Sequence, residues 1–332
     1  MFLRVVKKVL FGLLLFVLFL VVLVAYLSSG RLEEEEYTEL ITYKTRSTAS
    51  DSTLKVMTYN LGYLSGMTNN RPIRREPDFF SSNLAAAKSL LQKVDADVIG
   101  VQEVDFGSSR SFYVNQLDTL ARVADYASGY RSVNWDKKYV PFPYWPPSRH
   151  FGRMLSGQAI ISNYALSSGQ TLVLPPNRSS PSYYRAFYLD RLLQVTEFDY
   201  LGEKVKVLNV HLEAFDLDTR LRQVEVVKGV YEEYASNFPV ILMGDFNAEI
   251  PAKSMDPDAI EALLTAPWIA SAVPFGKEAE NGTFPSDAPE RMIDYIFYNE
   301  NFLRCINAHV IIEAGQISDH LPVEAKFQLA TP

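Results

Sequence analysis

Short apolar runs, rich in β-branched and aromatic residues and bounded by turn residues, recur from residue 54 to the end of the chain. This pattern is typical of buried strands rather than of helices. The runs predict strands, in chain order, at 54–59, 98–101, 159–161, 192–198, 205–210, 240–243, 293–298, 310–313 and 323–327.

Two segments between these strands carry apolar residues at helical spacing, one over 84–94 and the other over 217–231. Strands interrupted by helices predict a single α/β domain over residues 54–332, since no Pro/Gly-rich linker divides it. Residues 140–153 hold four prolines among several aromatic residues. That composition predicts a long ordered loop rather than a regular element.

The N-terminus follows a different pattern. Nineteen residues without a charge run from Val9 to Leu27, which is long enough for a helix to cross the hydrocarbon core of a bilayer. Basic residues precede this run and acidic residues follow it, and basic residues stay on the cytoplasmic side. We therefore predict a cytoplasmic segment at 1–8, a single-pass membrane helix at 9–27 and export of the rest. Cleavage at residues 28–30, followed by secretion, is the alternative.

Residues 28–53 are rich in Ser, Thr and Glu, which indicates a solvated stalk with one short strand at Glu39–Tyr43. The charge is divided unevenly along the chain. Residues 1–30 contain three basic residues and no acid, so of the net charge of −7 the other 302 residues carry −10. An acidic body argues against a general nucleic-acid binder. The lone Cys305 excludes an internal disulfide framework and a CxxC metal site.

Polar residues that an apolar core would not select stand in or beside six of the predicted strands. Burying a carboxylate costs several kcal/mol unless a cation or hydrogen-bond donors compensate it, so repeated acids at such positions indicate a site. The candidates are Asn60, Glu103, His211, Asp245, Asn247, Asp294, Asp319 and His320. Oxygen ligands without thiolates indicate a hard ion, either Mg²⁺ or Mn²⁺.

Each of these signals is weak when taken alone. A glutamate that ends a strand, such as Glu103, is in most proteins a solvated rim residue or an ion-pair partner. Asp245 and Asn247 are typical of an Asx turn, and His211 is typical of a buried core histidine. Asp319 beside His320 could fix the tautomer of the imidazole and stabilise its protonated form, and a loop histidine next to a surface aspartate is the alternative.

As an ordered set, the motifs resemble the endonuclease/exonuclease/phosphatase superfamily of DNase I-like, metal-dependent phosphoesterases. GDFN and SDHLPV are the most specific of them. The matching segments are VMTYNLGY (56–63), ADVIGVQEVD (96–105), SGQAIISNYAL (156–166), VKVLNVHLEAF (205–215), PVILMGDFNA (239–248), RMIDYIFYN (291–299) and ISDHLPVEAKF (317–327). The resemblance implies a four-layered α/β sandwich of two mixed β-sheets flanked by helices, preceded here by one membrane helix.

The resemblance also implies a metal site. It makes Glu103 the main Mg²⁺ ligand, places Asn60 beside the ion as a ligand or hydrogen-bonding group, and makes Asp319 a further metal contact.

For catalysis, the resemblance implies that Asp245 activates or aligns the attacking water and that Asn247 positions the phosphate. His211 and His320 would stabilise the phosphoryl oxygens, with Asp294 orienting His320. Members of the superfamily divide the roles of base and electrostatic stabiliser differently, so the general base stays open.

These inferences favour a membrane-tethered, Mg²⁺-dependent phosphodiesterase that acts on a lipid head group or another small phosphodiester. The membrane helix, the acidic body and Trp145 in the 140–153 loop support it, since Trp is enriched at membrane interfaces. Ordinary packing at the sandwich edge is an equal interpretation of that loop.

A DNase I-type endonuclease is the alternative, in which Arg149 and Arg153 would contact phosphates. Arg185 and Arg191 are candidates for binding the substrate phosphate in either case. A catalytically silent binding module ranks last, because every site residue is present. The residues give no indication of a protein partner.

Overall fold

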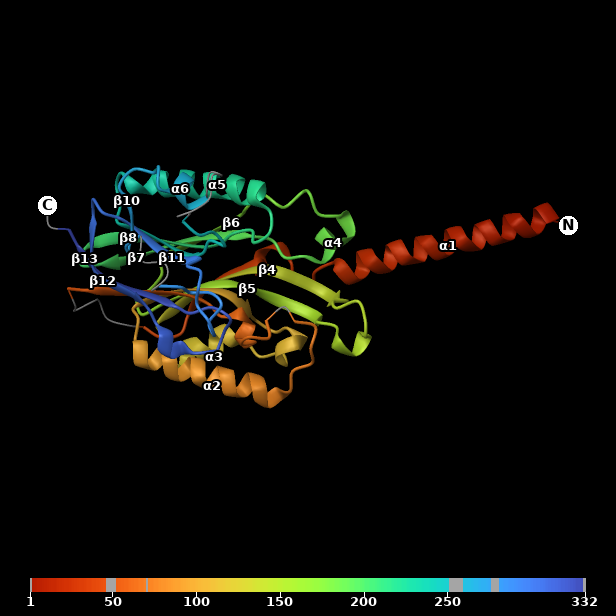
Figure 1. Ribbon diagram of the computed structural model, residues 1–332, viewed down its shortest axis with the longest axis horizontal. Coiled ribbons are helices and arrows are strands. Elements are labelled where there is room, and N and C mark those ends of the chain that lie inside the picture. Colours follow the sequence, from red (N-terminus) through yellow and green to blue (C-terminus); the bar gives the residue numbers. More distant parts are fainter. Residues whose placement is uncertain (1, 46–51, 70, 251–258, 276–280, 331–332) are drawn as a thin grey trace.

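The computed structural model describes residues 2–45, 52–69, 71–250, 259–275 and 281–330. Two β-sheets pack face to face, and helices cover their outer faces, which gives four layers (Figure 1). One hydrophobic core runs between the sheets and under the helices. The fold expected from the resemblance, a four-layered α/β sandwich, is confirmed.

The first sheet has seven strands in the order β1-β4-β5-β3-β2-β13-β12. Strands β2 and β3 run parallel, and the other neighbours run antiparallel. The strands are β1 (Thr38–Thr42), β2 (Leu54–Asn60), β3 (Val98–Asp105), β4 (Ser128–Val140), β5 (Gly152–Ser162), β12 (Leu303–Val310) and β13 (Val323–Leu329).

The second sheet has six strands in the order β10-β11-β9-β8-β7-β6. Strands β8 and β9 run parallel, so this sheet is mixed as well. Its strands are β6 (Ser168–Val173), β7 (Leu192–Tyr200), β8 (Glu203–His211), β9 (Val240–Asp245), β10 (Ile269–Ser271) and β11 (Asp294–Asn299).

Helices α2 (Pro77–Val94) and α3 (Gln116–Val123) cover the first sheet, while α5 (Leu217–Ala235) and α6 (Ala259–Leu263) cover the second (Figure 1). Helix α2 starts with a proline. A backbone N–H at the first position of a helix has no intrahelical acceptor, so the proline costs no hydrogen bond there. Helix α5 starts at Asp216, whose carboxylate accepts the Thr219 N–H. The short helix α4 (Ser182–Phe187) stands apart from both layers. The 3₁₀ turns are 34–37, 62–64, 109–111, 147–149 and 312–314.

Most predicted strands are found, and 310–313 is the exception. Strand β12 ends at Val310 and a 3₁₀ turn over Ile312–Ala314 follows, with Ile312 exposed, so the apolar run there was misleading. The sequence patterns missed β4, β6, β10 and β12. In β4 the reason is clear: Ser132, Asn134 and Asp136 are buried polar residues that hide its apolar alternation.

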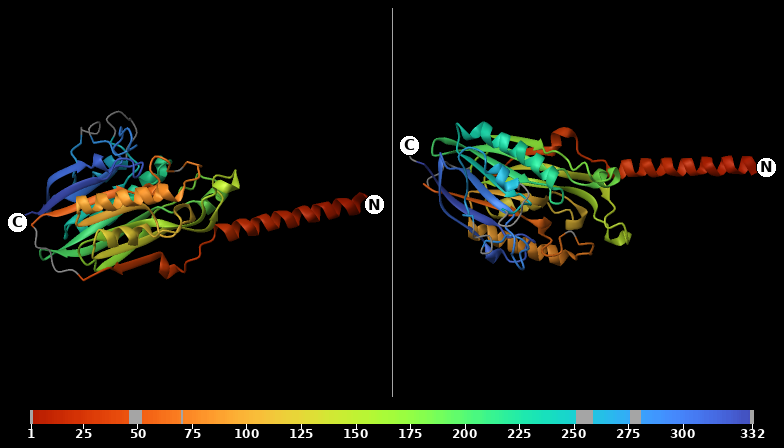
Figure 2. Two further views of the ribbon diagram at one scale, coloured as in Figure 1. Left: turned by 90° about the horizontal axis from the view of Figure 1, so that it is seen from below. Right: turned by 45° about the horizontal axis from the view of Figure 1, so that its top comes forward.

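The apolar N-terminus forms helix α1 (Phe2–Ser28), which leaves the domain and has no buried residue (Figures 1 and 2). Its length and apolar composition are sufficient to cross a membrane, and a signal sequence passes the same test. The helix leaves the domain at the end where the β4–β5 connection and α4 lie (Figure 1).

The segment interpreted as a stalk is corrected in part by the structure. Strand β1 pairs antiparallel with β4 at the edge of the first sheet, close to the short strand expected at Glu39–Tyr43. Just before it, the backbone N–H groups of Arg31 and Leu32 donate to the buried Asp136 carboxylate at 2.6 and 2.9 Å. Residues 29–42 are therefore docked on the domain, while residues 46–51 of the predicted stalk lie outside the described residues.

Candidate active site

Strand ends from both sheets bring the candidate residues together. Asn60 ends β2, Glu103 lies near the end of β3, and His211 and Asp245 end β8 and β9. Because β2–β3 and β8–β9 are the parallel pairs, their carboxyl ends share one edge of the sandwich. Asp294, which begins the antiparallel β11, pairs directly with Asp245 in the sheet.

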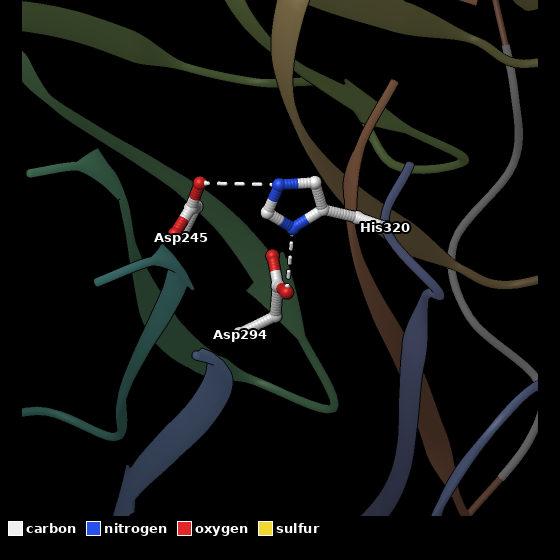
Figure 3. Close-up of side chains that lie close together, drawn as sticks. All are labelled: Asp245, Asp294 and His320. Carbon is white, nitrogen blue, oxygen red and sulfur yellow. Dashed lines mark hydrogen bonds and ion pairs between the residues drawn. The ribbon is translucent and has the colours of Figure 1, made fainter. Parts of the chain in front are cut away.

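His320 lies between two carboxylates, as Figure 3 shows. Its Nδ1 lies 2.9 Å from Asp294 Oδ2, and its Nε2 lies 3.9 Å from Asp245 Oδ2. All three side chains are buried, and their potential ligand atoms lie within 4.8 Å of one another. The Asp294 contact orients the imidazole, as the resemblance implied for this position.

Asp245 is the centre of the hydrogen-bond network. Its Oδ2 accepts the Asn60 amide at 2.8 Å and lies 3.3 Å from His211 Nε2. The oxygen of the Asn60 amide accepts the Gly62 N–H at 3.0 Å, so this side chain is engaged on both ends. Asn60 thus joins the first sheet to Asp245 of the second sheet.

Asn247 follows Asp245 in a tight turn rather than in extended backbone. Its backbone N–H donates to Asp245 Oδ1 at 2.9 Å, and its φ of 49° lies in the left-handed region. The turn-type interpretation of this pair is therefore correct, and the residues still line the site. Gly244 before them is required by the sheet itself, because a Cβ there would lie 1.9 Å from the Val210 carbonyl oxygen.

Burial and neighbouring charges shift the pKa values of these groups in different directions. Burial alone would lower the pKa of His320, but the carboxylates of Asp294 and Asp245 outweigh it and raise the pKa to about 10. Burial, with a contribution from Asp294, raises the pKa of Asp245 to about 7. Burial and the charges of Arg191 and His320 hold the pKa of His211 well below its usual value. At neutral pH, His320 is protonated and His211 is neutral.

Glu103 and Asp319 form a second acidic pair at the mouth of the site. The Asn69 amide nitrogen donates to both, at 2.8 Å to Glu103 Oε2 and 3.2 Å to Asp319 Oδ1. Burial and the charge of Asp319 raise the pKa of Glu103. Glu103 sits in a β-bulge of β3 with φ of 52°, a conformation that turns its side chain toward the site.

This pair fits a hard divalent cation. The two carboxylates face each other across one neutral amide, and a cation between them would remove the repulsion that raises the Glu103 pKa. Carboxylate and amide oxygens are ligands that Mg²⁺ accepts. The trio of Asp245, Asp294 and His320 contributes a nitrogen and is already joined by the His320–Asp294 hydrogen bond, so it suits proton transfer better than Mg²⁺ binding.

The structure separates the two arginines that were candidates for phosphate binding. Arg191 is buried, and in the described part of the chain its Nε and Nη1 have no hydrogen-bond partner. Its Nε lies 3.8 Å from Glu213 Oε2, and Arg191 lines the site. Arg185 is exposed on α4 and lines a neighbouring cavity of about 390 Å³, which Arg191 also lines, but Arg185 does not line the site. Arg153 pairs with Asp136, so it is engaged inside the fold.

The site opens into a cleft of about 690 Å³ with two unlike halves. The polar half is lined by most of the candidate residues together with Arg191 and Arg291, while Asp294 and Asn60 lie behind this lining. The other half is aromatic and aliphatic and is built by the β4–β5 connection and the α4 region. We call it the aromatic half, and it consists of Trp135, Val140, Pro141, Phe142, Tyr144, Phe151, Tyr184, Phe187, Tyr188, Leu189 and Phe215.

Sequence reasoning missed two features of this site. Asn69 lies in an irregular segment after β2, and nothing in its neighbourhood marks it as a partner of Glu103 and Asp319. The aromatic half was also missed as a cleft wall, although the proline-rich composition of residues 140–153 did indicate an ordered loop.

Comparison with known proteins agrees with this geometry. Residues 57–320 match the model of the endonuclease/exonuclease/phosphatase family. The matched range covers most of the chain and includes every acidic and histidine candidate named above. A search of curated proteins finds no match. The chain therefore belongs to the endonuclease/exonuclease/phosphatase family, whose members hydrolyse phosphoric ester bonds.

Solved structures share the fold. An endonuclease/exonuclease/phosphatase from Beutenbergia cavernae is 19% identical with a TM-score of 0.59, covering 84% of this chain and 72% of its own. A mannosyl-6-phosphatase from Bacteroides thetaiotaomicron is 19% identical with a TM-score of 0.58, covering 84% of this chain and 100% of its own. D. rerio TDP2 complexed with a single-strand DNA product is 15% identical with a TM-score of 0.58, covering 84% and 100%. At these identities the likeness concerns the fold alone.

Proposed function

We propose that this member of the endonuclease/exonuclease/phosphatase family is a membrane-anchored, Mg²⁺-dependent phosphodiesterase acting on a lipid head group or another small phosphodiester. One observation carries the hydrolytic part of the proposal. An acid-oriented imidazole, a hydrogen-bonded carboxylate and a separate acidic pair converge on one cleft. These are the groups that in-line attack of water on a phosphoester requires.

Glu103 and Asp319 would hold the metal ion, and Asn69 would steady both carboxylates, while the Asn60 amide contacts Asp245 instead. An ion held there would supply positive charge that offsets the charge on the phosphate oxygens and on the leaving oxygen. Manganese offers the same ligand preferences and is expected to substitute.

Asp245 orients the attacking water. Asn60, His211 and the Asn247 backbone hold its carboxylate in place, and a pKa of about 7 makes it able to accept a proton near neutral pH. His320 Nε2 lies 3.9 Å from Asp245 Oδ2, so a proton that Asp245 gains stays close to His320.

His320, Arg191 and Asn247 supply donors to the phosphoryl oxygens. His320 stays protonated because Asp294 raises its pKa, so it donates without needing a prior proton transfer. Arg191 contributes guanidinium nitrogens that have no hydrogen-bond partner in the described part of the chain. A neutral His211 donates through one ring nitrogen only. Donors fixed in a buried site stabilise a developing charge more than they do in water.

The membrane part of the proposal is supported by α1, which is long and apolar enough to span a bilayer. Basic residues before it favour an N-terminus in the cytoplasm and a catalytic domain on the other side. The aromatic half of the cleft favours a substrate that carries an apolar group next to the scissile phosphate.

A nuclease remains the second candidate because D. rerio TDP2, which shares the fold, is complexed with single-strand DNA product. Against it, Arg153, which a nucleic-acid groove would use, is engaged in an ion pair with the buried Asp136.

The experiment uses the full chain in phosphatidylcholine nanodiscs with Mg²⁺. Bis(p-nitrophenyl) phosphate, p-nitrophenyl phosphate and plasmid DNA are assayed in parallel, with and without EDTA. We expect hydrolysis of the diester above the monoester, loss with EDTA, and recovery with Mg²⁺ or Mn²⁺. Hydrolysis that is unaffected by EDTA would contradict the metal assignment, and faster cleavage of DNA than of the small diester would favour the nuclease.

A further inference from the structure

We propose that the aromatic half of the cleft binds the alkyl part of a membrane lipid, and that the docked linker after α1 holds this half against the bilayer so that the lipid enters from its own leaflet. This inference rests on the proposed phosphodiesterase function and names where its substrate lies and how it is reached.

The aromatic half adjoins the reacting groups without a break. Tyr188, whose hydroxyl accepts from Arg191 at 3.4 Å, lies at the junction of the two halves. Beyond it, Trp135 and Phe151 pack edge to face at 6.2 Å between ring centroids, and Phe142 packs on Phe151 at 5.2 Å. A phosphate held by Arg191 would therefore direct its attached group along an apolar wall.

That wall is fixed rather than loose. The Trp135 indole N–H donates to the Phe187 carbonyl at 2.8 Å, which ties β4 to the end of α4 across the cleft. Trp135, Val140, Phe151 and Met154 form a small core of their own, separate from the main one. A separately packed apolar wall beside a polar site is the arrangement that a ligand with one polar and one apolar end fits.

The linker fixes this wall next to the membrane helix. Asp136, one residue after Trp135, accepts the N–H groups of Arg31 and Leu32 and the Tyr37 hydroxyl. Two residues further on, the Lys138 N–H donates to the Ser29 carbonyl at 2.9 Å, and the Lys138 ammonium lies 4.5 Å from the centre of the Tyr26 ring. Strand β4 thus holds the anchor on one side and lines the cleft on the other.

The cleft rim near the anchor exposes aromatic side chains. Trp145 is 80% exposed and Tyr144 is 64% exposed in the β4–β5 connection, and Phe215 is 82% exposed after β8. Helix α1 also contacts α4, the other side of the rim (Figures 1 and 2). Aromatic residues at the level of the head groups are typical of surfaces that rest on a bilayer.

These observations commit the proposal to a lipid chain rather than to a nucleobase. Val140, Pro141 and Leu189 line the wall with the rings, and several of the rings already pack edge to face on one another. An alkyl chain gains from such a surface in proportion to the area it buries, whereas a base would need a free ring face for stacking.

The test is competition against a soluble substrate. Hydrolysis of bis(p-nitrophenyl) phosphate by the full chain in phosphatidylcholine nanodiscs is measured with Mg²⁺. Alkylphosphocholines with butyl, hexyl and octyl chains are added as competitors. We expect inhibition to strengthen by about fourfold for each added methylene, and we expect Phe142→Ala combined with Phe187→Ala to flatten this dependence on chain length. Phe275→Ala is the matched control, since Phe275 is 40% exposed, like Phe142 at 39%, and does not line the cleft.

The outcomes separate the two proposals. No hydrolysis of the soluble diester by the wild-type chain would overturn the proposed function itself. Two outcomes would overturn the lipid-chain proposal alone. In one, the diester is hydrolysed but inhibition does not depend on the length of the alkyl chain. In the other, inhibition depends on chain length and the Phe142 and Phe187 variants keep that dependence. Stronger inhibition by thymidine 5′-monophosphate than by octylphosphocholine would do the same and would point to a nucleotide.

The contact with the bilayer has a readout that needs no turnover. In nanodiscs made with brominated phosphatidylcholine, tryptophan fluorescence is expected to be quenched, and Trp145→Phe is expected to remove much of the quenching. Trp268→Phe is the control, because Trp268 is 44% exposed and lies just before β10 rather than in the β4–β5 connection. Quenching that Trp145→Phe leaves unchanged would contradict the placement of the rim on the membrane.

Discussion

The two halves of the cleft are built in different ways. The polar half is made mostly of residues at or beside strand ends, so backbone pairing within the sheets fixes much of it, as in the direct pairing of Asp294 with Asp245. The aromatic half is made mostly of a loop and a short helix beside the end of β4, held by contacts such as the Trp135–Phe187 hydrogen bond. This difference is what the proposed function requires: residues that the strands hold in place would carry out the chemistry, and the more variable loops would select the substrate.

The largest expected effect concerns the acidic pair. Glu103→Gln removes a charge from the metal site while keeping the side-chain size, and we expect activity on every phosphodiester to fall by about 10³-fold or more. Isothermal titration with Mn²⁺ should show weakened binding in the same variant. Full activity in a folded Glu103→Gln protein would contradict the role of the acidic pair in hydrolysis. Glu290→Gln, an exposed acid that does not line the cleft, is the matched control.

A smaller loss is expected from Asp294→Asn, by about 10²-fold. Asp294 raises the pKa of His320, so its neutral replacement lowers that pKa and His320 loses its donor proton at lower pH. The alkaline limb of the pH profile of kcat/KM should therefore move to lower pH. A lower rate with an unmoved alkaline limb would mean that Asp294 only packs against the imidazole.

Arg191→Met should raise KM more than it lowers kcat, with a loss in kcat/KM of about 10²-fold for lipid and soluble substrates alike. Arg185→Met is the control from the neighbouring cavity and should leave both constants nearly unchanged. If Arg185→Met lowers kcat/KM more than Arg191→Met does, the phosphate binds in the neighbouring cavity and the assignment of Arg191 is wrong.

The smallest expected effect comes from the linker. A Cβ at Gly30 would lie 2.5 Å from an Asp136 carboxylate oxygen, so Gly30→Val should loosen the docked linker. We expect a loss of a few-fold on lipid in nanodiscs and none on bis(p-nitrophenyl) phosphate. Equal losses on both would indicate that the linker supports the fold rather than the orientation of the cleft.

The same contrast explains what could be predicted from the sequence. Glu103, His211, Asp245, Asp294 and His320 stand beside apolar strands, where a buried acid or imidazole is conspicuous, and the structure brings them together. Motifs at strand ends predict a site because the pairing of the strands places those ends at one edge of the sheet.

Contacts made by irregular segments left no such signal. The pairing of Asn69 with two carboxylates and the burial of Arg191 depend on how distant loops pack. The docking of residues 29–42 was obscured by a run of glutamates, typical of a solvated spacer, and by the polar composition of β4.

The most direct test of the central claim is a comparison of specificities. For an octyl and a butyl ester of p-nitrophenyl phosphate, the ratio of kcat/KM is measured in the wild-type chain, in Phe142→Ala and in Asp245→Asn. We predict that the ratio favours octyl in the wild type, falls toward one in Phe142→Ala with much of the butyl activity kept, and is unchanged in Asp245→Asn despite a large loss of rate. A ratio that is the same in all three proteins would contradict the division of the cleft into a chemical half and a substrate half.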